Sequence, residues 1–583
     1  MSIEYPTTAH LRHRKVNSLN KVQDGQTLSY KDLHNQQKHL TIINRLRIFL
    51  LNDGLSYLFI AVWVLISSLV FGLGFVHYDL NDDAHLSGRG DAHIIQARTI
   101  FGKSFVSAKS AALCLHINIA FILFPVCRTL VSFARSTPLG QVIPFDKNID
   151  FHKIVGYAIC FFTVIHVLSH QSNFARLAIH NGTGFKGFFF SNFASGPGAT
   201  GWIMLLCLMT MLYFARQKKL RRANVGYERF WYSHHLFIPF FILWQSHGMF
   251  CMIQPDSPPY CNYNVVGVFW KYWIAGGVIY IGERLLREYR ARKLTYISKV
   301  IQHPSKVIEL QIRKEGIRTQ AGQYIFLNCP AISLWQWHPF TLTSAPEEDY
   351  ISVHIRIAGD FTKALAAKLG CDLDQEDKVI EGDDPNGVNA GVVNKVLPRV
   401  MIDGPFGSAS EDVFNYEIAV LVGAGIGVTP FASILKDIWY RAHWPDPNKP
   451  TRLSKVYFIW VIRDFGSAEW FHSLLHAIEE QDLDNYIEIQ TYLTAKIKVD
   501  DIQNILAHDI GSERDAISGL RAPTNFGRPN WDRIFQGITA KHPNTDAGVF
   551  FCGPQALGSA LHKCCNKYSN PKGTRFFFGK ENF

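Results

Sequence analysis

Long apolar runs alternate with short polar loops in the first half of the chain, and short β-rich runs alternate with turns in the second half. Each apolar run is close to the length that crosses a bilayer as a helix, which needs about 20 residues. An even number of crossings returns the chain to its starting side. We predict six membrane-spanning helices, at residues 55–76, 111–133, 153–169, 202–215, 232–250 and 265–281.

Basic residues mark the ends of these runs. The loop of residues 77–97 carries several aspartates and one arginine, whereas the loops on the other side are rich in arginine and lysine. This asymmetry is typical of cytosolic loops on the arginine-rich side. It predicts that both termini are cytosolic. It also indicates that the net charge of +11 comes from basic residues at the membrane edges, which argues against a surface that binds nucleic acid. The basic groups are Arg45 and Arg47, Arg128 and Arg135, Arg216–Arg222, and Arg284–Lys293.

The chain has 583 residues, more than a single hydrophobic core usually supports. Its composition predicts four segments. Residues 1–46 are polar and are expected to form a flexible cytosolic extension without a signal peptide. Residues 47–290 form the membrane domain, residues 291–408 a β-rich domain, and residues 409–583 an α/β domain.

Four histidines lie inside the third and fifth apolar runs, in two pairs of nearly equal spacing. Ionisable groups inside a membrane are costly and usually functional, and histidine nitrogens can hold haem iron. We predict two stacked haems, each held by one histidine from each helix. Polar packing between helices is the alternative for any single histidine, but it requires four coincidences here. The pairs are His152 with His166 and His234 with His247.

Helix geometry supports the first pair directly. Fourteen residues advance about 21 Å and about 1400° along a helix, so His152 and His166 lie within about 40° of one face. The second pair is thirteen residues apart and falls about 220° round a straight helix. We therefore expect a bend or rotation in that run. Pro239 can remove a helical hydrogen bond, and His235 or an earlier helix end would also restore the geometry.

Position in the chain also predicts which haem is which. His152 and His234 follow basic cytosolic loops, so they are expected to hold an inner haem. His166 and His247 lie further along the outward-running helices and are expected to hold an outer haem. Electrons would then enter from the cytosolic side.

In the β-rich domain, the segments HPFTLTS at 338–344 and HIRIAGDFT at 354–362 together resemble the two flavin-binding segments of ferredoxin-reductase-like enzymes. Residues 294–329 contain short β runs separated by turns, which predicts a small antiparallel barrel. Arg356 suits a pyrophosphate because its guanidinium pairs two oxygens and stays charged. Thr341 and Ser344 offer hydroxyls, although ordinary barrel threonines are the alternative for each alone. The candidate flavin residues are His338, Pro339, Phe340, Thr341, Ser344, His354, Arg356 and Thr362.

A glycine-rich turn follows the buried run of residues 418–422 and opens a helical run. Glycines let the backbone approach a pyrophosphate at a helix N-terminus. Arg463, at the end of the next strand, suits the 2′-phosphate of NADPH, with a solvated arginine as the alternative. The remaining nucleotide candidates are Gly423, Gly425, Gly427, Thr429 and Pro430, together with Gly553 and Pro554 after a later strand.

Residues 47–583 resemble the NADPH oxidase catalytic subunits, transmembrane flavocytochromes b of the ferric reductase superfamily. The most specific matches are HPFTLTSAPEED at 338–349, GAGIGVTPFASILK at 423–436, GRPNW at 527–531 and the terminal KENF. The resemblance implies a six-helix membrane domain plus a cytosolic ferredoxin-reductase-like module, with an antiparallel FAD barrel and an α/β NADPH domain. It also implies that NADPH reduces FAD, which passes single electrons through two b-type haems to molecular oxygen, producing superoxide.

The same resemblance implies roles for four further residues. Cys552 is expected near the nicotinamide, and Phe583 is expected to stack on the flavin until the nicotinamide displaces it. Arg98 and His170 are expected to border the outer haem, where cationic groups would stabilise a nascent superoxide anion.

Some features depart from the best-known members. Residues 381–391 form an added polar loop, and Gln555 stands where an acidic residue is common. No EF-hand pattern is present in the sequence, which disfavours direct calcium control. The resemblance implies three partners, namely a small membrane subunit, a cytosolic activator and a Rac-type GTPase. The basic loop 216–229 is a candidate contact, or simply a segment facing lipid headgroups.

Two other functions remain open at this point. A ferric or cupric reductase would use the same electron chain, and a six-span channel or transporter would place histidines on a proton path. The channel leaves the flavin and nucleotide segments unexplained and predicts no haem absorbance. The outward loops also hold a glycosylation triplet at Asn181 and a possible disulfide between Cys251 and Cys261. The protein is expected in the plasma membrane or an endomembrane.

Overall fold

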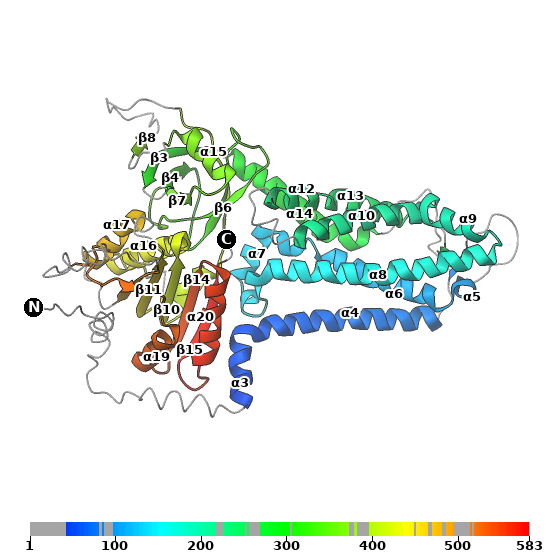
Figure 1. Ribbon diagram of the computed structural model, residues 1–583, viewed down its shortest axis with the longest axis horizontal. Coiled ribbons are helices and arrows are strands. Elements are labelled where there is room, and N and C mark those ends of the chain that lie inside the picture. The colour runs from blue at the N-terminus through cyan, green and yellow to red at the C-terminus, as the bar shows by residue number, and fades with distance from the viewer. Residues whose placement is uncertain are drawn as a thin grey trace, which may run out of the picture.

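In the computed structural model, a bundle of long helices extends from one side of a mixed α/β body (Figure 1). The N-terminal segment 1–41, Cys251, Cys261, most of the added loop 381–391 and Phe583 lie outside the described residues. The structure describes residues 42–80, 84–86, 97–216, 226–250, 253–255, 269–303, 306–371, 378–381, 396–447, 451–463, 469–480, 486–494, 514–515 and 518–581.

The helical domain packs around a shared apolar core. Helix α6 packs against α4, α8 and α14, and α10 packs against α12 and α13. The core contains Trp63, Leu115, Val155, Phe162 and Trp244. The main helices are α3 (Ile42–Phe49), α4 (Leu55–Leu80), α6 (Lys103–Phe121), α7 (Arg128–Arg135), α8 (Asn148–His180), α10 (Gly196–Arg216), α12 (Gly226–His234), α13 (Phe237–His247) and α14 (Trp270–Arg292).

Among the described residues, four helical stretches are long and apolar enough to cross a membrane. The fifth predicted span is divided into α12 and α13, of 9 and 11 residues, each shorter than a bilayer requires. The sixth is the 23-residue α14, whose second half is charged. Each of the six predicted runs therefore contains a helix among its described residues, but the count of six crossings stays a prediction. The four stretches are Ile42–Leu80, Lys103–Val126, Phe145–His180 and Gly196–Arg216.

The second predicted span, 111–133, has the wrong boundaries. Helix α6 begins at Lys103, directly after Gly102, whose φ of +61° lies outside the helical range. The long helix ends at Phe121, just before a 3₁₀ turn that contains Pro125. Proline lacks the N–H that a continuing helix needs. The arginines that follow belong to the separate helix α7.

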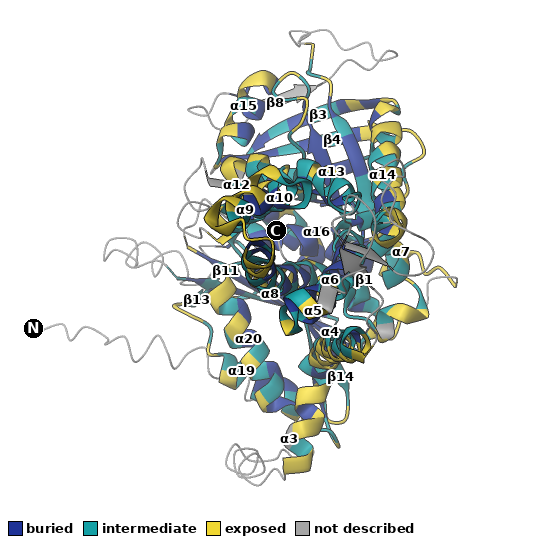
Figure 2. Cartoon of the chain, turned by 90° about the vertical axis from the view of Figure 1, so that its right-hand side faces the viewer, coloured by how far each residue is buried: buried dark blue, intermediate teal, exposed yellow. Residues whose placement is uncertain are grey.

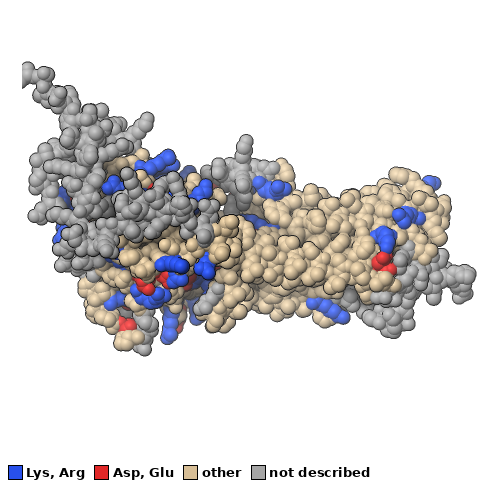
Figure 3. All heavy atoms as spheres, turned by 90° about the horizontal axis from the view of Figure 1, so that it is seen from below, with Lys and Arg blue, Asp and Glu red and all other residues tan. Residues whose placement is uncertain are grey.

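The surface of the helical domain suits lipid. Figure 3 shows a broad area over it with few charged side chains. Large apolar side chains point outward along the four long helices, and such a surface is expected where hydrocarbon replaces water. They include Leu69 (51% exposed), Leu73 (68%), Phe161 (61%) and Leu206 (68%).

The β-rich domain consists of two small antiparallel sheets, as predicted. One has the strand order β7-β4-β3-β8 and the other β6-β5-β9. Alternate residues of these strands enclose a buried core, which helix α15 (Asp360–Leu369) closes on one side. The strands are β3 (Thr295–His303), β4 (Val307–Lys314), β5 (Tyr324–Asn328), β6 (His338–Thr341), β7 (Ile351–Arg356), β8 (Lys378–Glu381) and β9 (Met401–Phe406).

The C-terminal domain is a six-stranded parallel sheet with the order β13-β12-β11-β10-β14-β15. Buried residues concentrate on the strands, whereas the outward sides of the helices are exposed (Figure 2). The chain runs from β10 to one side of the sheet and later returns beside it as β14, so the order reverses between them. The strands are β10 (Ile418–Ala424), β11 (Lys455–Ile462), β12 (Ile487–Leu493), β13 (Asn525–Phe526), β14 (Asp546–Cys552) and β15 (Arg575–Lys580), and the helices α16 (Thr429–His443), α17 (Glu469–Glu480), α19 (Trp531–Lys541) and α20 (Gln555–Tyr568).

Candidate functional site

The structure places each histidine of α8 opposite one histidine of the fifth predicted span, as expected for two haems that are each held by both helices. From here on, the inner pair is His152 with His234 and the outer pair is His166 with His247. The ring centres of His152 and His234 are 6.1 Å apart, and those of His166 and His247 are 6.4 Å apart. Two metal–nitrogen bonds of about 2 Å, plus about 1 Å from each nitrogen to its ring centre, add to about 6 Å. Each pair is therefore spaced for one metal ion between two imidazoles.

His234 and His247 both face the histidines of α8 because the fifth predicted span is interrupted between them. Helix α12 ends at His234 and α13 begins at Phe237. The amides of His235, Leu236 and Ile238 each bond to a carbonyl three residues earlier, which winds the backbone more tightly than an α-helix. Pro239 follows, without an N–H for the next bond. The predicted distortion is thus present, one turn before Pro239, and His235 is exposed with its Nδ1 bonded to the Trp231 carbonyl.

Hydrogen bonds fix the orientation of three of the four rings. His152 Nδ1 donates to the Ile122 carbonyl at 3.0 Å, and His166 Nδ1 donates to the Ala108 carbonyl at 3.1 Å. A histidine that ligates a metal usually donates its other ring nitrogen in this way. The bond leaves Nε2 with its lone pair, which is the state that binds iron. Both rings of helix α8 are therefore prepared as ligands.

The outer pair has a hydroxyl partner. Thr200 Oγ1 donates to the Gly196 carbonyl at 2.8 Å, so it accepts from His247 Nδ1, also at 2.8 Å. His234 Nδ1 is buried and has no hydrogen-bond partner among the described residues. Beside the inner pair, a Cβ added to Gly156 would meet no atom within 4 Å, so the helix leaves open space there. These features fit two haem groups.

The two flavin segments lie close together on the barrel, on β6 and on β7 with the start of α15. His338 stacks on Phe361 with ring centres 3.9 Å apart, and burial lowers the pKa of His338 to about 4. Arg356 is exposed at the end of β7, next to the N-terminus of α15. The Gly359 amide donates to Thr362 Oγ1 at 3.0 Å, which fixes that helix end. A guanidinium beside a helix N-terminus is suited to a pyrophosphate.

Of the two candidate hydroxyls on this barrel, that of Ser344 already has a partner within the protein. Thr341 is 6% exposed and Ser344 is 2% exposed. Ser344 Oγ accepts from the Ser352 amide at 3.0 Å, and the Ser344 carbonyl accepts from Ser433 Oγ of α16 at 2.7 Å. Ser344 therefore also joins the barrel to the nucleotide domain. Pro339 is exposed and Phe340 is half-buried on β6.

The glycine-rich turn lies at the carboxyl end of β10, where the strand order reverses. Such a switch point is where open α/β sheets bind nucleotides. Gly425 has φ +57°, and a Cβ on Gly427 would lie 2.5 Å from the carbonyl oxygen of Cys552. Gly553 has φ +152°, and its Cβ would lie 2.8 Å from Ala424 Cβ. The predicted glycines therefore bring the ends of β10 and β14 into contact. Gly423 lies one residue before the end of the same strand, and Thr429 and Pro430 begin α16.

Comparison with known proteins agrees with this arrangement. Family models match residues 117–244 ("Ferric reductase like transmembrane component"), 293–410 ("FAD-binding domain") and 416–566 ("Ferric reductase NAD binding domain"). NADPH oxidase 1 of Mus musculus is 36% identical over 94% of this chain and 96% of its own. The chain belongs to the NADPH oxidase family.

Two further relatives span the same extent. A superoxide-generating NADPH oxidase heavy chain of Dictyostelium discoideum is 38% identical, over 91% of this chain and 97% of its own. NADPH oxidase 3 of Homo sapiens is 36% identical, over 92% of this chain and 99% of its own. The oxidase is therefore a membrane protein in which a ferric-reductase-like helical domain is followed by FAD-binding and NAD-binding domains.

In this oxidase, the residues expected at the oxygen end are only partly described. The ring of His170 lies 4.5 Å from that of His166, edge to face, so it borders the outer pair. Arg98 belongs to the short helix α5 (Ala97–Phe101), but its side chain lies outside the described residues. Asn181 is exposed at the end of α8.

Several residues near the outer pair were not found from the sequence. Lys109 of α6 lies close enough to His166 and His170 to act on them electrostatically. His116, about two turns further along α6, is 6% exposed. Its ring stacks on that of Tyr272, with ring centres 4.0 Å apart. Both lie in or before the predicted second span, but their neighbours come from other helices. A polar residue in an apolar run was the only signal available.

Three further residues expected at the NADPH site lie at the carboxyl edge of the parallel sheet. Cys552 ends β14 and is 6% exposed, and burial raises the pKa of its thiol to about 12. Arg463 is exposed just after β11. Pro554 begins the turn into α20. Strand β10 lies between β11 and β14, and all three strands are parallel, so the three positions share the carboxyl edge of the sheet.

The C-terminus is anchored at the same edge by a residue that sequence reasoning missed. Glu581 is 6% exposed, and its Oε1 accepts from the Ser410 amide at 2.8 Å and from Ser410 Oγ at 2.6 Å. The Glu581 amide donates to the Phe551 carbonyl at 2.9 Å, beside Cys552. Phe583 itself lies outside the described residues, two positions further on.

Proposed function

We propose that this oxidase moves electrons from cytosolic NADPH across the membrane to molecular oxygen and releases superoxide. FAD and two b-type haems supply the electron-transfer chemistry when bound. The observation that carries the proposal is the pair of histidine pairs, at 6.1 and 6.4 Å, in a helical domain attached to a flavin- and nucleotide-binding module. The Dictyostelium relative is named for superoxide generation.

Within the membrane domain, the histidines have assigned positions. His152 and His234 hold the inner haem, and His166 and His247 hold the outer haem. The Nδ1 donations to Ile122 and Ala108 keep both α8 rings in the tautomer that ligates iron through Nε2. We also propose six crossings with cytosolic termini, since the basic helix ends lie on the side of the flavin domain.

In the cytosolic module, residues of the two domains would bind and orient FAD and NADPH. Arg356 and the α15 terminus hold the flavin pyrophosphate, and the β6 segment from His338 to Thr341 borders the flavin ring. The glycines at 423, 425 and 427 let the NADPH pyrophosphate approach the start of α16, and Arg463 pairs its 2′-phosphate. Cys552 would line the nicotinamide position, and Phe583 would cover the flavin ring until NADPH binds.

At the outer face, Arg98 and His170 stabilise the anion formed from oxygen. The proposed partners are a small membrane subunit, a cytosolic activator and a Rac-type GTPase, with the basic loop 216–229 as one contact; residues 217–225 of this loop lie outside the described residues. Asn181 is a proposed glycosylation site and Cys251–Cys261 a proposed disulfide of the outward loops. The plasma membrane or an endomembrane is the proposed location.

The test is NADPH-driven superoxide formation by the purified full chain in lipid vesicles, with each ligand histidine replaced by alanine in turn. We expect a b-type reduced-minus-oxidised spectrum in the parent protein. Each variant should lose superoxide formation and haem absorbance while NADPH still reduces FAD. Absence of a haem signal in the parent protein would refute the proposal. Reduction of ferric chelates without superoxide would favour the ferric reductase instead.

A further inference from the structure

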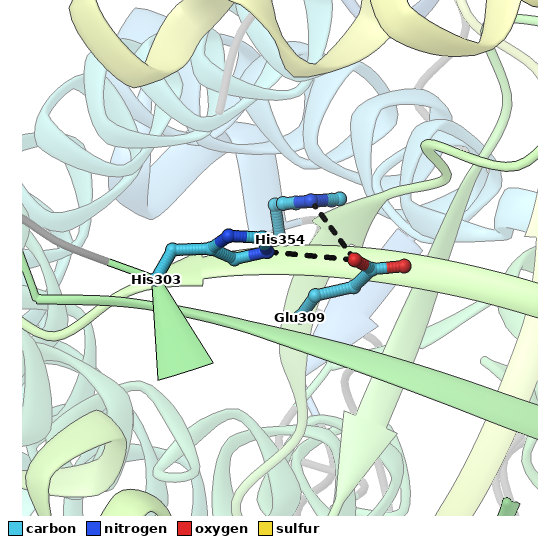
Figure 4. A group of neighbouring side chains, drawn as sticks. All are labelled: His303, Glu309 and His354. Carbon is cyan, nitrogen blue, oxygen red and sulfur yellow. Dashed lines mark ion pairs between the residues drawn. The ribbon is translucent and has the colours of Figure 1, made fainter. Parts of the chain in front are cut away.

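A cluster of three metal-ligating side chains lies on the outer face of the flavin barrel. His303 ends β3, Glu309 lies on β4 and His354 on β7, and the three point toward one another (Figure 4). One ligating atom of each lies within 4.8 Å of those of the other two. Cross-strand pairing aligns them, because Glu309 pairs with His354 and His303 pairs with Val307, two positions before Glu309.

The distances within this cluster differ from those of hydrogen bonds. Nε2 of His303 and Nε2 of His354 each lie 3.5 Å from Glu309 Oε2. Hydrogen bonds between nitrogen and oxygen are usually 2.7–3.2 Å long. Ligand atoms about 2.0–2.2 Å from a tetrahedral ion are instead separated by about 3.4 Å. His303 Nε2 is also buried without a hydrogen-bond partner among the described residues.

Neighbouring groups hold the three side chains in this orientation. Gln311 Nε2 donates to Glu309 Oε1 at 3.0 Å, which leaves Oε2 facing the histidines. Nδ1 of His354 lies 2.8 Å from Thr343 Oγ1, which in turn lies 2.8 Å from Ser352 Oγ. A second ring nitrogen bonded in this manner is typical of metal-ligating histidines.

The chemical state of the side chains also suits a cation. Two imidazoles and one carboxylate form a donor set that divalent transition-metal ions bind. The nearby Lys436 is neutralised by Glu348, at 3.1 Å.

We propose that His303, Glu309 and His354 form a binding site for a divalent transition-metal ion, with zinc the best match to two imidazoles and one carboxylate. A fourth position would be left for water, as in other sites with this ligand set. The ion would tie β3, β4 and β7 together. This site is separate from the haem and nucleotide chemistry, so its failure and that of the proposed function are distinguishable. It also gives His354 a role other than the flavin contact expected from the sequence.

The experiment uses the purified full chain with its haems and FAD, stripped of loose metal with a chelator and dialysed against micromolar Zn²⁺. Zinc per chain is measured by mass spectrometry, with the two haem irons as the internal standard. We expect one tightly held zinc in the parent protein and at least a tenfold weaker affinity in Glu309→Gln and His303→Ala. His542→Ala is the matched control, since it removes a half-buried histidine that bonds Tyr457 in another domain.

X-ray absorption at the zinc edge identifies the ligands. Two nitrogen ligands and one carboxylate oxygen at about 2.0–2.2 Å are expected. Zinc should also raise the melting temperature of the parent protein and of His542→Ala but not of Glu309→Gln, because only a ligand of the native state stabilises it. Glu309→Gln keeps the side-chain shape, so it decides the question even if His303→Ala folds poorly. Equal zinc binding by the parent protein and Glu309→Gln, or a zinc spectrum without histidine ligands, would refute the proposed site. The cluster would then be a group of ion-paired side chains without a metal.

Discussion

A single hydroxyl group controls the orientation of His247. Thr200 Oγ1 accepts the Nδ1 proton of His247 at 2.8 Å, which makes the imidazole a stronger donor to the ion it binds. Thr200→Val removes this acceptor with little change of shape. A weaker donor favours ferrous over ferric iron, so we expect the outer haem potential to rise by tens of millivolts, since about 59 mV corresponds to a tenfold change. A spectroelectrochemical titration measures it.

The matched control lies on the same helix. Thr210 Oγ1 bonds only to the Leu206 carbonyl and is exposed, so Thr210→Val should leave both haem potentials unchanged. A shift of the inner haem in Thr200→Val, or equal shifts in the two variants, would contradict the assignment of Thr200 to His247.

The glycine-rich turn makes a second prediction at the scale of one residue. Gly427→Ala would place a Cβ 2.5 Å from the Cys552 carbonyl, so the ends of β10 and β14 must separate. We expect KM for NADPH to rise at least tenfold while haem and FAD contents stay normal. The control is Gly537→Ala in α19, where a Cβ meets nothing within 4 Å and alanine favours the helix. An unchanged KM in Gly427→Ala would show that this turn does not carry the nucleotide.

The thiol of Cys552 should react slowly in the folded protein. Burial raises its pKa to about 12, and the thiolate is the reactive form. The half-buried Cys564 has a pKa raised only to about 11, again by burial. We expect iodoacetamide at pH 8 to modify Cys564 well before Cys552, as followed by peptide mass spectrometry. Modification of Cys552 first would mean that its end of β14 is open to solvent.

At the scale of elements, the sequence predicted those helices and strands whose pattern lies within a short stretch of the chain. Helical periodicity identified the first histidine pair, and the mismatch of the second pair predicted a distortion, which is the α12–α13 break. Buried runs and glycines identified β10 and the start of α16. The second span was misplaced because Lys103 and Lys109 interrupt the apolar pattern in the first turns of α6.

Pairings between distant strands were beyond the reach of one sequence. His303 and His354 are separated by fifty residues and meet Glu309 only through the register of β3, β4 and β7. Glu581 likewise meets Ser410 across a sequence separation of 171 residues. Strand register depends on the whole sheet, and a shift by one residue turns each side chain to the other face. Such clusters therefore become visible only in three dimensions.

The interruption between α12 and α13 makes a prediction about the helix as a unit. One alanine inserted after Leu236 would rotate α13 by about 100° relative to α12. His247 would then leave its position opposite His166, whereas His234 would keep its partner. We expect loss of the outer haem and retention of the inner haem, measured as the ratio of haem to FAD.

A control insertion distinguishes rotation from general damage. An alanine placed after Gly182, just past the end of α8, meets open space and should leave both haems bound. Loss of both haems in the first insertion would contradict independent pairs. Retention of both would show that the break at His235 and Leu236 absorbs the change.

At the scale of the whole molecule, electron transfer depends on how the α/β body is held against the helices. Asn52, just before α4, donates to Asn566 Oδ1 at 2.8 Å and accepts from the Phe578 amide at 3.0 Å, on the edge of the nucleotide domain. Arg290 of α14 bonds Asp403 of β9 at 3.3 Å. The densest contact surrounds Arg135, the last residue of α7, whose side chain is 12% exposed.

Arg135 joins three carboxylates: Asp146 of the helical domain at 2.9 Å, Glu411 at 3.1 Å and Asp412 at 2.6 Å. Removing it leaves the three acidic groups close together without their cation, although solvent screens Asp146 and Asp412, which are 46% and 42% exposed. We expect Arg135→Ala to keep NADPH-driven FAD reduction but slow haem reduction at least tenfold in stopped-flow absorbance. Arg452→Ala, which removes a 58% exposed partner of Glu417 within the nucleotide domain, should change neither rate. Haem reduction at the normal rate in Arg135→Ala would mean that the remaining contacts hold the flavin in place by themselves.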